Sequence, residues 1–108
     1  MFKNNEYYIG KILEDLDFIS DHMKSVNITD LESNQLLQDS MMFRLIQISE
    51  KVKYLTDEYR EEHFNIPWTD IYGLRNRIVH DYGNVDLGVI YDTLTKDIPD
   101  LKEILSKL

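Results

Sequence analysis

The residues best suited to chemistry in this sequence lie between Trp68 and Tyr82. On an ideal helix, Gly73, Asn76 and His80 fall within about 60° of one another, and Arg77 lies beside them. Gly73 would let another backbone approach closely, so the side chains of Asn76 and His80 would line the surface between that backbone and this helix. Because an imidazole titrates near neutral pH, His80 is a candidate for acid–base catalysis, although a capping or surface role is the commoner one. The pattern defines a candidate site and does not fix its activity.

Arg75 and Tyr82 are seven residues apart and share the opposite, apolar side of this helix. Arg75 lies about 140° from His80 around an ideal helix axis, so the spacing does not place them side by side. The helix could loosen before His80, the arginine could curl round, or a second copy could complete the pair. Arg75 could instead be the buried partner of an acidic residue. Tyr72, Tyr82 and Tyr91 would ordinarily be core aromatics with hydroxyls at the rim.

Helices would position these residues, because apolar residues recur at helical spacing through most of the chain. The first predicted helix has an apolar face from Ile9 to Val26, and Asp15 falls on its polar face. A second helix starts near Thr29, at a capping-box pattern, or a few residues later. It would run some 40 to 50 Å, to about Tyr59, and form the spine of the fold.

The remaining chain predicts more helices and no strands. Pro67 suits the first turn of a helix that runs from about Trp68 towards Asp81. Asp86 can cap a fourth helix, which Pro99 would kink or restart. No strand-like alternation of apolar and polar residues occurs. We therefore expect an all-α, up-and-down bundle of four to five helices.

Composition excludes several classes of protein. Hydrophobic residues make up 43% and charged residues 30% of the 108 residues, as in globular proteins, and we expect a single domain over residues 1–108. The absence of cysteine excludes disulfides and thiolate chemistry. No apolar run approaches the roughly 20 residues of a membrane span, so we expect a cytoplasmic protein with no membrane contact. The formal charge of −8 argues against general affinity for nucleic acids.

Residues 75–82, Arg-Asn-Arg-Ile-Val-His-Asp-Tyr, resemble the Arg-x4-His-x-Tyr signature of HepT-like toxins, a branch of the HEPN superfamily. The resemblance covers roughly residues 36 to 106. The flanking segments that follow the same family pattern are residues 66–68, 71–76 and 97–101. Ile48-Ser49-Glu50-Lys51 resembles the family's Ile-Gly-Glu-Ala helix, from which it departs at the serine and the final lysine, and Tyr91 stands where a tryptophan is common.

The resemblance implies an HEPN-like homodimer that acts as a metal-independent endoribonuclease, the toxin of a type VII-like toxin–antitoxin pair. In such families the arginine and histidine of both copies meet in a cleft on the two-fold axis. Carried over, His80 would help an RNA 2′-hydroxyl attack the adjacent phosphorus. Arg75 would stabilise charge on the phosphate oxygens, and Asn76 would position one of them. Because cleavage needs both a base and an acid, a second copy would supply the other His80, and a monomer would be inactive.

The resemblance also implies a partner, a minimal nucleotidyltransferase antitoxin that attaches AMP to Tyr82. The added charge and bulk would occupy the place of the RNA phosphate and silence the nuclease. ATP and metal would belong to that partner, so we expect no cofactor in this chain.

Two copies would carry a formal charge of −16, twice the −8 of one chain, so local charge must attract the RNA. Arg75 and Arg77 of each copy would supply it. Arg44 and Lys51 would extend this RNA-binding surface, although an ordinary solvated helix face is the alternative. We expect weak, salt-sensitive affinity and selection of structured RNA.

A second function stays open, that of a non-catalytic helical subunit that binds a nucleotide or substrate for a two-component nucleotidyltransferase. The bundle alone does not separate the two functions, but the intact set of Arg75, His80 and Tyr82 favours the ribonuclease. A kinase-like catalytic loop is excluded, because the chain is too short and lacks the glycine-rich loop and its lysine.

Overall fold

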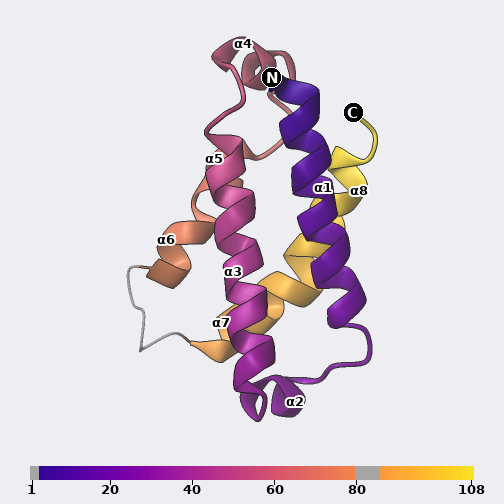
Figure 1. The fold of residues 1–108 in the computed structure, drawn as a ribbon, viewed down its shortest axis with the longest axis vertical. Helices are drawn as coiled ribbons and strands as arrows, with labels where there is room; N and C mark the ends of the chain where they lie inside the picture. The colour runs from indigo at the N-terminus through magenta and orange to yellow at the C-terminus, as the bar shows by residue number, and fades with distance from the viewer. Residues whose placement is uncertain (1–2, 80–85) are drawn as a thin grey trace.

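The computed structural model describes residues 3–79 and 86–108, without the side chains of residues 77 and 79. Every regular element in these ranges is helical, which confirms the all-α class (Figure 1). The elements are α1 (Asn5–His22), α2 (Ile28–Glu32), α3 (Gln35–Val52), α4 (Asp57–Glu62), α5 (Trp68–Tyr72), α6 (Leu74–Val79), α7 (Leu87–Asp92), the π-helical turn η1 (Thr93–Asp97) and α8 (Ile98–Leu105). In the part of the chain that the structure describes, no helix has the length and apolarity needed to cross a bilayer.

The two long helices, α1 and α3, lie side by side and run in opposite directions (Figure 1). Helix α8 packs against α1, while α5 and α6 pack against α3. Most of the side chains between these layers are aliphatic, and Ile12, Leu16 and Ile48 are completely buried. Each such side chain contributes roughly 1.5–3 kcal/mol of hydrophobic free energy, so α3 is fixed as the support for α5 and α6.

The long helix predicted as the spine of the fold is not continuous, because three side-chain caps divide residues 28–62 into α2, α3 and α4. Asn27 and Asp30 form the first cap, in which Asn27 Oδ1 accepts from the Asp30 amide at 2.8 Å. Asn34 accepts from the Leu37 amide at 3.0 Å and starts α3, and Thr56 starts α4. Each cap satisfies amides that a helix start leaves unpaired, so new helices begin there. The 18 residues of α3 span about 27 Å rather than 40 to 50 Å.

The helix predicted from Trp68 towards Asp81 is also divided, because α5 ends at Tyr72 and α6 begins at Leu74. The chain therefore forms more and shorter helices than the four to five expected. Two other boundaries are confirmed. Asp86 caps α7 by accepting from the Gly88 amide at 2.9 Å. Pro99 lies in the first turn of α8, where its missing N–H costs nothing, directly after η1.

Candidate active site

Arg75 is held at the start of α6 by a side chain from α3. Its Nε lies 3.1 Å from Glu50 Oε1, and 43% of the arginine side chain is exposed. Arg75 therefore does pair with an acidic residue, as one alternative proposed, but the pair lies at the surface rather than in the core. The partner carboxylate fixes the guanidinium on one side while leaving it within reach of solvent and of an anionic ligand.

Glu50 is kept charged by its neighbours. Lys53 Nζ donates to Glu50 Oε2 at 2.8 Å, and this hydrogen bond, with the positive charges of Lys53 and Arg75, lowers the pKa of Glu50 below its usual 4.5. Because the folded-state pKa is lowered, the ion pairs are complete above about pH 4.5 and are lost as pH falls through that lowered pKa. Glu50 thus holds Arg75 throughout the neutral range.

The residue beside Glu50 fixes the joint between α5 and α6. Ser49 is completely buried, and its Oγ donates to the carbonyl of Tyr72, the last residue of α5. At Gly73 the backbone is tight, since an added Cβ would lie 3.3 Å from the Thr69 carbonyl oxygen. Two consecutive residues of α3 therefore hold the two sides of the joint. Ser49 binds the end of α5, and Glu50 binds Arg75 at the start of α6. Ser49 stands where the resembling family has glycine, and that departure was the only sequence signal for this contact.

The two-sided pattern predicted for this segment holds for its buried isoleucines at 71 and 78 and fails at Tyr72. Tyr72 is 44% exposed rather than in the core, and Lys53 Nζ lies 5.9 Å from the centre of its ring. Asn76 lies exposed on α6, as its predicted role requires. Tyr91 follows the prediction, since it packs against the core and its hydroxyl donates to the Val26 carbonyl at 2.9 Å.

His80 and Tyr82 lie outside the described residues, and so does the side chain of Arg77. The geometry therefore brings together Arg75, Glu50 and the α5–α6 joint, and it leaves open how Arg75 and His80 meet. Their meeting, and the role of Arg77 in binding RNA, stay predictions.

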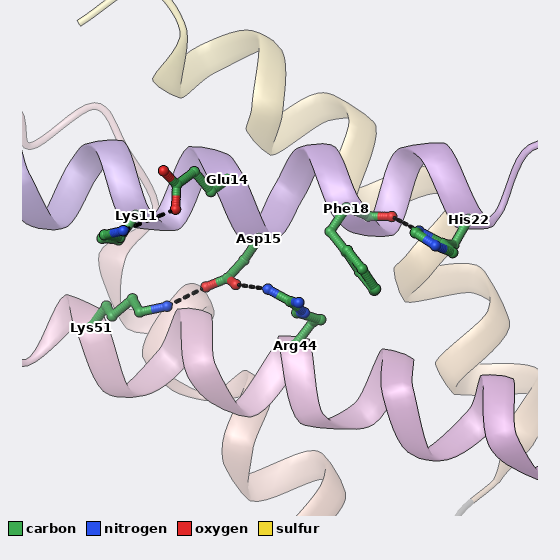
Figure 2. Close-up of polar contacts among 7 residues, drawn as sticks. All are labelled: Lys11, Glu14, Asp15, Phe18, His22, Arg44 and Lys51. Atoms are coloured by element: carbon green, nitrogen blue, oxygen red, sulfur yellow. Dashed lines mark hydrogen bonds and ion pairs between the residues drawn. The ribbon is translucent and has the colours of Figure 1, made fainter.

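Arg44 and Lys51, the other predicted RNA-binding residues, converge on a buried carboxylate (Figure 2). Arg44 Nη1 lies 2.8 Å from Asp15 Oδ1, and Lys51 Nζ lies 2.6 Å from Asp15 Oδ2. Asp15 is 2% exposed, so its assignment to the polar face of the first helix was wrong. Both cations already neutralise Asp15, and they hold α3 against α1. An added role in binding RNA stays a prediction for both.

We expect Asp15→Asn to destabilise the fold by about 1–3 kcal/mol, because an amide cannot balance the two charges that face it. Urea unfolding measures this free energy. Asp17→Asn is the matched control, since Asp17 lies on the same helix, its side chain is 57% exposed and it pairs with Lys102 at 2.9 Å. That exposed pair adds little to stability, because water screens it. Equal stability of the two variants would show that the buried triad does not hold the helices together.

Comparisons with known proteins place the whole chain beside one family of ribonucleases. The model of the family described as "Ribonuclease HepT-like" matches residues 4–108. A "Putative RNase" of Caldanaerobacter subterraneus subsp. tengcongensis is 35% identical over 104 residues, which cover 93% of each chain. A Methanocaldococcus jannaschii protein named "Gamma-glutamylcyclotransferase and putative RNase" is 34% identical over 108 residues, all of this chain and 49% of that protein.

A third relative matches almost from end to end. The "Probable ribonuclease HepT" of Thermococcus cleftensis is 27% identical over 108 residues, which cover 100% of this chain and 98% of the relative. Among solved structures, none gives a significant match. Because the family model spans nearly the whole chain, this protein belongs to the ribonuclease HepT-like family.

Proposed function

We propose that this protein is a metal-independent endoribonuclease of the cytoplasm, with an active site that is completed at the cleft of a homodimer. The observation that carries the proposal is the arginine of the family signature, which is anchored and still accessible. Arg75 is fixed by Glu50 at 3.1 Å and keeps 43% of its side chain exposed. Because this guanidinium is partly exposed, it can donate hydrogen bonds to a phosphodiester without first breaking a buried contact.

The proposed reaction needs no group beyond the RNA and the protein. A neutral His80 takes the proton of the ribose 2′-hydroxyl, and the 2′-oxygen attacks the adjacent phosphorus. The bond from phosphorus to the 5′-oxygen breaks, which leaves a 2′,3′-cyclic phosphate, and a protonated His80 of the second copy gives its proton to the leaving oxygen. Arg75 stabilises the charge on the non-bridging oxygens, and Asn76 positions one of them.

Exposed apolar side chains on α3 support the homodimer. Leu36 is 81% exposed and Phe43 is 55% exposed, and Glu50 follows at the same seven-residue spacing. Residues seven apart share one face of a helix, so this apolar line leads along α3 to the side chain that holds Arg75. Exposed apolar surface of this kind marks interaction sites, and a two-fold axis across it would bring two copies of the site together.

We further propose that the protein is the toxin of a toxin–antitoxin pair. A nucleotidyltransferase antitoxin would transfer AMP to Tyr82, the last residue of the Arg-x4-His-x-Tyr signature. An AMP group two residues from His80 would bring a negative charge to the place where Arg75 and His80 must receive the RNA phosphate.

Cleavage of RNA in the presence of a chelator tests the proposed nuclease. The purified protein should cut RNA equally well with and without EDTA, and it should leave 2′-O-methyl RNA of the same sequence intact, because that RNA lacks the attacking hydroxyl. Gel analysis of labelled RNA measures both. Strict dependence on a divalent cation would contradict the proposed chemistry. Failure to cut any RNA, together with binding of a nucleotide, would favour the non-catalytic subunit.

A further inference from the structure

A hollow of about 590 Å³ lies between the first half of α1 and the last half of α3. Its walls combine lysines with tyrosines, namely Lys3, Lys11, Lys51, Tyr7, Tyr8 and Tyr54. Glu50, the residue that holds Arg75, also lines it. The hollow therefore shares one side chain, Glu50, with the candidate active site.

Two of the three tyrosines are exposed, and the third packs between them. Tyr8 and Tyr54 stack with ring centres 5.1 Å apart and planes only 16° from parallel. Tyr54 is nevertheless 61% exposed, so the ring face away from Tyr8 is open. Tyr7 meets Tyr8 edge-on at 5.2 Å and is itself 39% exposed. A flat aromatic ligand could extend the stack on the open face of Tyr54.

The stack is held by a polar clamp beneath it. Asn5 Nδ2 donates to Thr56 Oγ1 at 3.1 Å, and the Thr56 amide donates back to Asn5 Oδ1 at 3.0 Å. These two hydrogen bonds join the start of α1 to the start of α4, two residues after Tyr54. Because the clamp fixes the backbone on both sides of the stack, less order would have to be gained on binding.

Positive charge gathers around the same rings. Lys3 Nζ lies 5.3 Å and Lys11 Nζ lies 5.7 Å from the centre of the Tyr7 ring. Lys11 pairs with Glu14 at 3.2 Å, and Lys51 pairs with Asp15. The lining itself holds three lysines against one glutamate, in a chain whose formal charge is −8. Because Glu14 and Asp15 balance two of these lysines, the hollow is closer to neutral than the acidic molecule as a whole, and Lys3 lies at its edge beside the Tyr7 ring.

We propose that this hollow, the tyrosine platform, binds an unpaired stretch of the RNA that the proposed active site cleaves. The inference rests on the proposed ribonuclease function. A base would stack on the open face of Tyr54, and Lys3 and Lys11 would contact neighbouring phosphates. Aromatic faces with interleaved cations are how proteins bind single strands without reading sequence. Since Glu50 lines the hollow and pairs with Arg75, a strand bound on the platform would lie near the proposed active site.

Binding of a fluorescent 2′-O-methyl RNA strand, which the proposed chemistry cannot cut, tests the platform by anisotropy. Tyr54→Ala should weaken binding roughly 5- to 150-fold, the range expected for loss of one stacked base. Tyr54→Phe keeps the ring and should bind like the unchanged protein. Phe64→Ala is the matched control, because Phe64 is 84% exposed but lies outside the platform, and its loss should change nothing.

A second measurement separates a binding role from a folding defect. Replacing Lys3 and Lys11 by glutamine should lower the slope of log affinity against log salt by about 0.7 for each phosphate contact removed. Full affinity in Tyr54→Ala, or equal affinity for a duplex of the same sequence, would overturn the platform. If binding depends on Tyr54 but the protein cleaves no RNA, the proposed nuclease is wrong and the platform is right. The two failures are therefore distinguishable.

Discussion

Replacing His80 with alanine should abolish RNA cleavage and leave the protein folded and dimeric. In the proposed mechanism His80 is both the base and, from the second copy, the acid, so its loss removes proton transfer at both reacting oxygens. General acid–base catalysis contributes about 10²–10⁴-fold for each positioned group, so residual cleavage should fall below ordinary detection. Cleavage of labelled RNA measures the loss, and light scattering measures the dimer.

The control for this variant is His22→Ala. His22 is exposed near the end of α1, where its ring stacks on Phe18 at 4.0 Å and Nδ1 lies 2.8 Å from the Phe18 carbonyl oxygen. These contacts are local to α1 (Figure 2), so the variant should cut RNA normally. Undiminished cleavage by His80→Ala would remove His80 from the mechanism.

Tyr82→Phe should keep nuclease activity and escape AMP transfer completely. The variant lacks only the phenolic oxygen to which AMP would be joined, so no phosphodiester can form there. Incubation with the candidate nucleotidyltransferase and ATP, followed by mass spectrometry of the intact protein, measures the transfer. The unchanged protein should gain mass and lose nuclease activity, and the variant should do neither.

Tyr91→Phe provides the comparison for this result. The Tyr91 hydroxyl is already engaged with the Val26 carbonyl at 2.9 Å and packs at the edge of the core. Its loss should leave AMP transfer unchanged. A mass gain on Tyr82→Phe equal to that of the unchanged protein would show that another residue is modified.

The fold class was predictable because helical periodicity is a local property of the sequence. Asp86 and Pro99 gave correct boundaries for the same reason, since a cap and a restrained φ act within one turn. The length of the predicted spine was wrong because capping asparagines and threonines compete with helix continuation. Asn34 and Thr56 cap new helices with their side chains, so one predicted helix forms as shorter ones.

The site was predictable in its residue types but not in its contacts. Arg75 was singled out from its spacing, yet Glu50 lies 25 positions earlier in the sequence, and no periodicity links the two. Asp15 shows the same limit. A carboxylate on the edge of an amphipathic helix is expected to face water. Its burial is possible here because Arg44 and Lys51 approach from α3 and offset the cost of removing the charge from water. Tertiary pairing overrides local pattern in both cases.

Subunit mixing tests the central claim most directly, namely that two copies share each cleavage site. The unchanged protein and His80→Ala are mixed in equal amounts, allowed to exchange subunits, and assayed on RNA at fixed total concentration. If a dimer needs both histidines, only dimers of two unchanged copies are active, and activity should fall to about one quarter of that of the unchanged protein. Activity of about one half would show that each copy cuts RNA on its own, and would contradict the shared site.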